Sequence, residues 1–335
     1  MKTNNARATF LFCGALLAGA STLAARDVED KMHQSFPAKP GGKLVVEADR
    51  GSIEVKPADV EQVEIDVSRK VGRESEAAAQ DILKNHEIKF SKDEDTVRVH
   101  AEFAKDWKSS WRDKGRNLQV RYVISVPKKF NVDLKTAGGS IKVADLVGEA
   151  RSQTAGGSLS FGQIEGPIQG RTAGGSVAVA GCKGDVDVET SGGSIKLGEV
   201  SGNTKAHTSG GSITVGKLSG KSVVSTTGGS IDAADVGGSL DASTSGGSIT
   251  ARISAQPGGD CRFHTSGGSI KASLAENVAV DVDARTSGGR VVTDLPVTTI
   301  VKGEHKPNIL QGKINGGGPA LSLETSGGSI YLKKQ

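Results

Sequence analysis

Large side chains are scarce in this chain of 335 residues. Phe, Trp and Tyr together make up 4% of it, whereas glycine alone accounts for 46 residues, so a core built on large side chains is excluded. An excess of one charge is lacking too, because 42 basic residues stand against 38 acidic ones and the signs alternate along the chain. Nucleic-acid binding relies on clustered positive charge, so we exclude that class of protein and expect no nucleic-acid partner.

Long apolar runs are also lacking, apart from one at the N-terminus. The chain begins MKTNNARATFLFCGALLAGASTLAARDVED, in which Lys2 and Arg7 precede a short apolar run that ends in small residues. This pattern is typical of a signal peptide, which we predict over residues 1–25, and it indicates export to the periplasm or to the cell surface and medium. Cys13 lies inside the run rather than after it, so we expect no lipid anchor. No later segment is long and apolar enough to predict a transmembrane helix.

What the sequence has in abundance is one short motif, T-x-G-G, which occurs ten times and continues with Ser in nine copies. The motif recurs at intervals of 18 residues six times and 21 residues twice, and the last interval of 39 residues corresponds to one missing copy. The first glycines of the copies are Gly138, Gly156, Gly174, Gly192, Gly210, Gly228, Gly246, Gly267, Gly288 and Gly327. A fixed short period is typical of a solenoid, and this one is too short for a helix–turn–helix repeat. We therefore predict an all-β parallel β-solenoid (β-helix) of about ten coils of 18–21 residues over residues 131–335.

The columns of the repeat support this interpretation. One column after the Gly-Gly pair is apolar in every copy, the position two residues later is mostly apolar, and the residue between them is mostly polar. This alternation is typical of a strand with one buried face. A second strand is predicted before each motif, as in DVDVET at 185–190, with Val186, Val188 and Thr190 facing inward.

The motif itself is expected to form the corner between two strands. Glycine adopts positive φ without steric cost, so we expect the Gly pair to supply a sharp reversal. Stacked corners also require small side chains, and the Thr hydroxyl is expected to bond to backbone groups of the corner. A corner is needed in every coil, whereas a reactive site is needed once, so the tenfold recurrence argues against a catalytic role for the motif.

Cysteine is rare as well, with only Cys182 and Cys261 beyond the predicted signal peptide. Each replaces an aliphatic residue in a different apolar column, and the two lie about four coils apart, near 19 Å by stacking distance. A disulfide needs Cα atoms within about 7 Å, so we predict two buried, unpaired thiols.

No cofactor or metal site is predicted. His207 and His264 share an outward column about three coils apart, the other four histidines (His33, His86, His100 and His305) show no ligand spacing, and we expect all six on the surface. The motif has no Asp after its glycines to bind calcium, and no phosphate-loop sequence is present.

Catalysis is not predicted either. The best acid–base cluster is formed by Asp241, Arg262 and Asp283 in one outward column, beside His264 and Arg285. Alternating charges along a column are explained more simply as a solvated ladder that fixes the register, and no nucleophile–base pair stands out. We therefore expect a protein that is not an enzyme, with a polysaccharide-cleaving β-helix as the weaker alternative.

Two irregular features are better candidates for function. The two longer coils carry their extra residues at the same corner, in RISAQPGGD (252–260) and SLAENVAVD (273–281), and adjacent bulges would form a protrusion. The second feature is FAKDWKSSWRDKGR (103–116), in which Trp107, Trp111 and Arg112 are the candidate partner contacts. This segment could contact a protein partner, an envelope glycan or an anionic membrane surface, or it could fold over the end of the solenoid.

Residues 40–130 differ from the repeats and are predicted to form an α+β N-terminal cap. SEAAAQDILKNH (75–86) is its one convincing helix, with Ser75 as the N-cap, and residues 87–103 are predicted to form a hairpin. Such a cap would cover the unpaired strands at one end of the solenoid. At the other end, Lys333 and Lys334 after the last strand are expected to discourage edge pairing.

The stretches GGKLVVEADRGSIEVKP (41–57), VPKKFNVDLKTAGGSIKV (126–143) and KINGGGPALSLETSGGSIYLKK (313–334) resemble the bacterial "putative adhesin" β-strand-repeat family, a domain of unknown function. The resemblance covers about residues 40–335. It implies an exported β-solenoid without a known active site. Together these observations predict an exported, non-enzymatic envelope protein that acts as a scaffold or adhesion module, or alternatively as a regulatory module that senses an envelope ligand through Trp107 and Trp111.

Overall fold

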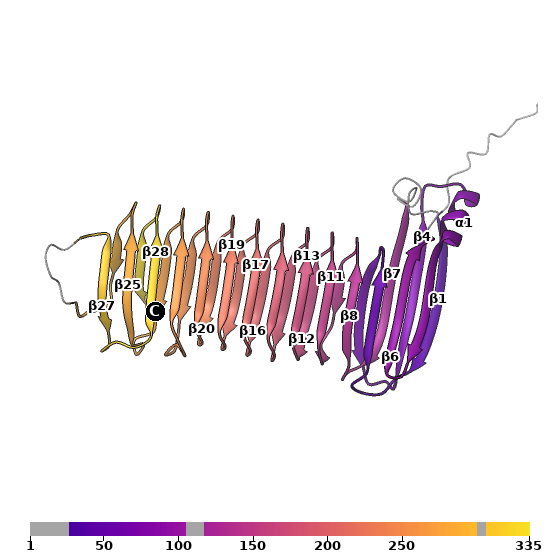
Figure 1. The fold of residues 1–335 in the computed structure, drawn as a ribbon, viewed down its shortest axis with the longest axis horizontal. Helices are drawn as coiled ribbons and strands as arrows, with labels where there is room; N and C mark the ends of the chain where they lie inside the picture. The colour runs from indigo at the N-terminus through magenta and orange to yellow at the C-terminus, as the bar shows by residue number, and fades with distance from the viewer. Residues whose placement is uncertain (1–26, 105–116, 300–305) are drawn as a thin grey trace, which may run out of the picture.

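The protein is an elongated rod made of two long β-sheets that face each other (Figure 1). The computed structural model describes residues 27–104, 117–299 and 306–335. The chain is 60% strand and 3% helix, so the all-β prediction is confirmed, and the long parallel sheets fit a solenoid. No helix in the described part of the chain is long and apolar enough to cross a membrane.

Sheet A, as we call the first sheet, has 15 strands among the described residues. In spatial order they are β1 (Val28–Pro37), β4 (Gln62–Val71), β7 (Leu118–Pro127), β3 (Ser52–Ala58), β9 (Ile141–Val143), β12 (Leu159–Glu165), β14 (Val177–Cys182), β16 (Ile195–Val200), β18 (Ile213–Leu218), β20 (Ile231–Val236), β22 (Ile249–Ile253), β24 (Ile270–Leu274), β29 (Ile330–Lys334) and β26 (Val291–Thr293), with β10 (Leu146–Val147) paired to β12.

Sheet B has 14 strands in the same part of the chain. They run in the order β27 (Ile309–Ile314), β25 (Val280–Thr286), β28 (Ala320–Thr325), β23 (Cys261–Thr265), β21 (Leu240–Thr244), β19 (Ser222–Thr226), β17 (Thr204–Thr208), β15 (Val186–Thr190), β13 (Ile168–Thr172), β11 (Ala150–Thr154), β8 (Asn131–Thr136), β2 (Lys43–Ala48), β6 (Thr96–Phe103) and β5 (His86–Asp93). From β11 to β24 the chain alternates between the sheets, so each coil contributes one main strand to each.

The predicted columns are confirmed as in-register parallel pairs. Ile195 in β16, for example, pairs with Val177 of the preceding coil and Ile213 of the following one, and all three are at most 1% exposed. The core of the rod is therefore a set of aliphatic columns from the inner faces of both sheets. One coil cannot bury its own columns, so each coil depends on its neighbours.

The corners depend on hydrogen bonds that repeat from coil to coil. The Thr190 hydroxyl donates to the Gly175 carbonyl oxygen of the preceding coil at 2.7 Å and accepts from the Gly193 amide at 3.3 Å. The Ser194 amide donates to the Ser176 hydroxyl at 3.3 Å. Since equivalent bonds recur at the other corners, the predicted role of the Thr column is confirmed.

The positive φ expected of the glycine pair was wrong, whereas the expected need for small side chains at stacked corners is confirmed. The five described glycines with positive φ are Gly41, Gly51, Gly148, Gly316 and Gly317, none of which lies in a T-x-G-G corner. The second glycine of each corner is instead required by close stacking, because a Cβ there would lie 1.9–2.4 Å from the carbonyl oxygen of the equivalent glycine in the neighbouring coil. The first glycine meets no such obstacle in most coils.

The repeats do not stack in chain order at either end of the rod. The last coil, β28–β29, lies between β23–β24 and β25–β26, so the coil that follows β24 along the chain is separated from it in space. At the N-terminal end, the coil β2–β3 lies between β6–β7 and β8–β9. Lys333 and Lys334 were expected to follow the last strand at a free edge, but both lie within β29, and β26, which pairs with Ile330–Leu332, is the last strand of sheet A.

The N-terminal end contains the one helix of the described chain, α1 (Glu76–Asn85). The Ala78 amide donates to the Ser75 hydroxyl at 3.3 Å, which confirms the predicted N-cap. The helix packs Ala79, Ile82 and Leu83 against the rod. The hairpin β5–β6 is confirmed as well, whereas the antiparallel edge strand β1 was not predicted.

Candidate functional site

The predicted contact residues Trp107, Trp111 and Arg112 lie outside the described residues. The structure describes the positions that flank this segment. Phe103, at the end of β6, is 2% exposed and Leu118, at the start of β7, is 5% exposed. A partner contact through the two tryptophans therefore stays a prediction.

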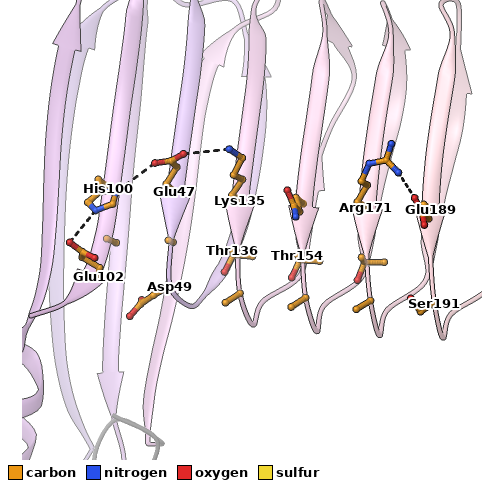
Figure 2. A pocket seen from close by; sticks show the side chains of 17 residues that line it. Glu47, Asp49, His100, Glu102, Lys135, Thr136, Thr154, Arg171, Glu189 and Ser191 are labelled. Carbon is orange, nitrogen blue, oxygen red and sulfur yellow. Dashed lines mark hydrogen bonds and ion pairs between the residues drawn. The ribbon is translucent and has the colours of Figure 1, made fainter. Parts of the chain in front are cut away.

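A hollow lies on the outer face of sheet B near the N-terminal end (Figure 2). It is a shallow groove of about 660 Å³ that crosses strands β6, β2, β8, β11, β13 and β15 near the corners. We call it the sheet B groove. Six strands at the usual spacing give it a length of about 24 Å across the strands.

Two rows of outward side chains form the groove. The upper row has one residue per strand in continuous register, namely His100, Glu47, Lys135, Gln153, Arg171 and Glu189. The lower row follows the corners and consists of Glu102, Asp49, Ala137, Ala155, Ala173 and Ser191. The three alanines occupy the variable position of the first three T-x-G-G motifs, and their small side chains leave room above the corner backbone.

The charges of the upper row pair with one another along the groove (Figure 2). Glu47 lies 3.8 Å from His100 Nδ1 and 3.5 Å from Lys135 Nζ, while Arg171 pairs with Glu189 and lies 3.3 Å from Asp187. These side chains are about half exposed, so each pair adds little to stability. Because they remain accessible, the same groups can exchange a partner for a polar ligand that lies along the groove.

Gln153 occupies the middle of the upper row, between Lys135 and Arg171. Its amide offers both a donor and an acceptor, so this part of the groove presents three side chains that can donate hydrogen bonds. Apart from the imidazole of His100, the groove has no aromatic residue among the described residues that line it. The arrangement suits an extended, polar ligand bound by hydrogen bonds rather than one held by ring stacking.

Asp49 connects the groove to a buried polar network. One carboxylate oxygen lies 3.2 Å from His86 Nε2, and the other accepts a hydrogen bond from the Phe103 amide at 3.2 Å. His86 is 1% exposed, so the prediction that it lies on the surface was wrong. It begins β5 directly after α1, and its ring faces inward against Phe103 with the ring centroids 5.0 Å apart.

Arg69 holds the same region together from the opposite sheet. Its guanidinium donates to the carbonyl oxygens of Leu83 at 2.8 Å and His86 at 2.6 Å, and it pairs with Asp30 of β1. The network therefore ties α1, β1 and β4 to the end of the groove.

Burial, together with the negative charge of Asp49, raises the pKa of Tyr122 well above its usual value, so its hydroxyl stays protonated.

The predicted acid–base cluster is not contiguous. Ser322 of the inserted coil lies between Arg262 and Asp283 in the register of sheet B. Glu324 likewise separates His264 from Arg285 and lies 3.6 Å from His264. The inserted coil could not be placed from the order of the repeats, which is why the cluster was mistaken for one continuous column. Within the described residues, no group of three His, Cys, Asp or Glu side chains is placed to hold a metal ion.

The cysteine prediction is confirmed, since Cys182 and Cys261 are both free and buried. Burial raises the pKa of both thiols.

The two bulged corners are adjacent as predicted, because the Gln256 side chain bonds to both backbone groups of Ala279 at 2.9 Å. Binding at these bulges stays a prediction.

The groove left only a weak signal in the sequence. The outward columns were recognised as polar, but Glu47 and His100 precede the repeats and could not be aligned with Lys135. The signal that could have located them is the corner-like Arg50-Gly51-Ser52-Ile53, which follows Glu47 at the distance seen in the repeats. The Thr136 hydroxyl indeed donates to the Gly51 carbonyl oxygen at 3.0 Å, as in a regular corner.

The family model described as Toastrack DUF4097 matches residues 42–333. A "putative adhesin" from Bacteroides fragilis NCTC 9343 is 13% identical, with a TM-score of 0.33 over 91% of this chain and 97% of that chain. A "putative lipid binding protein" from Parabacteroides distasonis ATCC 8503 is 11% identical, with a TM-score of 0.36 over 91% and 97%. A "putative cell adhesion protein" from Clostridium sporogenes ATCC 15579 is 13% identical, with a TM-score of 0.20 over 91% and 100%. No curated protein matches the chain.

Proposed function

The chain belongs to the Toastrack DUF4097 family, and on this premise we propose that it is an exported, non-enzymatic binding module of the cell envelope. In this proposal the rod is a scaffold, and the sheet B groove binds an extended polar ligand such as an envelope glycan or a peptide strand. The observation that carries the proposal is the groove itself, in which Lys135, Gln153 and Arg171 stand in register on adjacent strands above an alanine-lined corner.

The rigidity of the rod supports this role. The three side chains are fixed on strands whose register is set by buried columns and repeated corner bonds, so their spacing is preorganised. A ligand with polar groups repeated along its length would meet the row without reordering the protein, which lowers the entropic cost of binding.

Export rests on the N-terminal sequence. We propose that residues 1–25 act as a cleaved signal peptide and that the protein works in the periplasm or at the cell surface. We also propose that residues 40–130 act as the N-terminal cap, with β5 as the outermost strand of sheet B. The strand β1, which precedes these residues, is the outermost strand of sheet A.

The test is capture of isolated envelope components, namely peptidoglycan, membrane vesicles and soluble envelope proteins, by the immobilised protein. A variant with Lys135→Glu and Arg171→Glu reverses two charges in the groove and is expected to lose capture at least tenfold. The matched control carries Lys196→Glu and Lys271→Glu on the outer face of sheet A, where both lysines are exposed. The proposal is refuted if both double variants capture the ligand as well as the unmodified protein.

The alternative is a regulatory module that senses an envelope ligand through Trp107 and Trp111. A second hollow lies beside the flanks of this segment and is lined by Asp49, Arg50 and Leu118. Replacing residues 105–116 with a glycine–serine linker of equal length spares the buried Phe103. Loss of capture in the linker variant, with capture retained in the groove variant, would favour the alternative.

A further inference from the structure

The C-terminal coil, which we define as residues 320–335, fills a slot between two coils that precede it in the chain. Its strand β28 pairs in parallel with β23 on one side and β25 on the other. Its strand β29 pairs in the same way with β24 and β26. The end of the chain is thus a strand pair inserted into an otherwise formed stack.

The corner bonds of this coil are of the same kind as those of the regular coils. The Thr325 hydroxyl donates to the Gly268 carbonyl oxygen at 2.7 Å, and the Ser329 amide donates to the Ser269 hydroxyl at 3.2 Å. On the other side the Thr286 hydroxyl donates to the Gly328 carbonyl oxygen at 2.6 Å. The slot therefore recognises a T-x-G-G-S strand pair by backbone geometry and small side chains.

Contacts at the two ends of the coil make the fit specific. The Ala320 amide donates to Asp260 at 2.8 Å, and the Lys334 amide donates to Asp294 at 2.8 Å. The Lys334 ammonium group also pairs with Glu276 at 2.9 Å. All of these partners belong to the walls of the slot, so the contacts would be the same whichever copy of the chain supplied the coil.

The connection that leads into the coil is a short, tight crossing. Residues 315–319 carry the chain from β27, across the start of β25, to β28. Asn315, Gly316 and Gly317 adopt φ values of 51°, 89° and 88°, and the Asn315 amide group donates to the carbonyl oxygens of Glu276 and Val278. Short hinge loops favour exchange of the segment that follows them.

We propose that the C-terminal coil exchanges between two copies of this protein, so that each copy fills the slot of the other and the rods join at their C-terminal ends. This proposal is independent of any ligand in the sheet B groove. The exchanged and closed forms share every slot contact and differ only in the hinge and in the abutting ends, which is the condition for a domain-swapped dimer.

The reach of the hinge is sufficient. From Ile314 to Ala320 an extended chain spans about 20 Å. The path from β27 of one copy, past β27 of the other, to the second slot crosses three strand spacings, or about 14 Å. The isolated bridge between Thr298 and Lys313 lies on the outer edge of β27 and has to open when the ends meet.

Cysteine cross-linking tests the exchange. Ser273 and Lys333 are in-register neighbours on β24 and β29 with partly exposed side chains, so Ser273→Cys with Lys333→Cys is expected to form a disulfide across the slot wall. The full chain is unfolded and then refolded at protein concentrations on the order of 1 to 500 µM, because association of two copies depends on concentration. Each sample is oxidised, and its covalent monomers and dimers are separated by gel electrophoresis without reductant. We expect covalent dimers whose fraction rises with concentration.

A hinge variant sharpens the test. A Cβ at Gly316 would contact nothing within 4 Å, so Gly316→Ala strains only the positive φ of the closed hinge. Because two hinges are relieved per dimer, the association constant is expected to rise by about thirtyfold or more. The single variant Lys333→Cys is the control, because it shows how much dimer arises from a disulfide between the introduced cysteines of two chains.

Covalent monomers alone at every concentration, with and without Gly316→Ala, would overturn the proposal. If the exposed pair prevents folding, Leu321→Cys opposite the natural Cys261 provides a second cross-link across the slot. Sedimentation of the protein without added cysteines gives an independent measure of the dimer.

Discussion

The two glycines of each corner are predicted to differ strongly in their response to the same substitution. At Gly193 a Cβ would lie 2.2 Å from the Gly175 carbonyl oxygen, whereas at Gly192 it would lie 3.4 Å from the Gly174 carbonyl oxygen, an ordinary contact. Gly193→Ala therefore forces two coils apart, and Gly192→Ala does not. The two positions are adjacent and equally far from the ends of the rod, so each variant is the control for the other.

The expected magnitude follows from the bonds at this corner. Separating the coils weakens the bond from the Thr190 hydroxyl to the Gly175 carbonyl oxygen and the bond from the Ser194 amide to the Ser176 hydroxyl. At about 1 kcal/mol each, with about 1–3 kcal/mol for overpacking, Gly193→Ala is expected to lower the free energy of unfolding by about 3–5 kcal/mol. Gly192→Ala is expected to stay within about 1 kcal/mol, because the alanine also reduces the entropy of the unfolded chain.

Urea unfolding followed by circular dichroism measures the difference. Hydrogen exchange at the amides of β14 and β16 then shows whether the loss is local to the stacked corner, as expected for a repeat array in which coils contact only their neighbours. Equal midpoints for the two variants would refute the assignment of the second glycine to close stacking. A larger loss for Gly192→Ala would refute it as well.

Three further predictions test other parts of the structure. Thr190→Val removes a hydroxyl that makes two corner bonds at a residue that is 1% exposed, so it should cost about 2–3 kcal/mol of unfolding free energy in urea titrations, while Thr190→Ser should cost less than half as much. Burial raises the pKa of the Cys182 and Cys261 thiols, which lowers their thiolate fraction near pH 8, so iodoacetamide should label the folded protein at least tenfold more slowly than the urea-unfolded protein in mass spectrometry. Asp30→Asn leaves the buried Arg69 without its carboxylate partner and should lower the unfolding free energy by about 2–3 kcal/mol in thermal melts, and an unchanged melt would show that the pair does not hold β1 in place.

The sequence was sufficient to predict the parts of the fold that depend on periodicity. The apolar columns, the strand before each motif and the N-cap at Ser75 follow from side-chain alternation and local hydrogen bonding, and each is confirmed. The strand β1 was not predicted, because one of its inward positions is charged. These positions are Val28, Asp30 and Met32, and the carboxylate of Asp30 interrupts the apolar pattern that would indicate a buried face. Only the structure shows that Arg69 neutralises it.

The candidate groove was beyond prediction for a related reason. Its row combines Glu47 and His100, which precede the repeats, with Lys135 and Arg171, which belong to the repeat region. Their register is set by the insertion of β2 between β6 and β8, a long-range pairing whose only trace in the sequence is the corner-like Arg50-Gly51-Ser52-Ile53 after Glu47. Polar side chains on an outer face are also free to vary without loss of the core, so their pattern does not reveal which of them meet.

The order of the coils was hidden by the same regularity that made them recognisable. The Thr and Gly bonds of the corners would fit β25 stacked directly on β23 as well as β28 inserted between them. The Ser bond does not recur in the same way, because Arg290 replaces the Ser of the coil β25–β26 and can only donate its amide to the Ser329 hydroxyl. The choice must therefore come from contacts that occur once, such as those from Asp260 to the Ala320 amide and from Asp294 to the Lys334 amide. We expect such contacts, together with the Arg290 replacement, to favour the observed arrangement, so that Asp294→Ala changes the order of stacking before it changes the strand content.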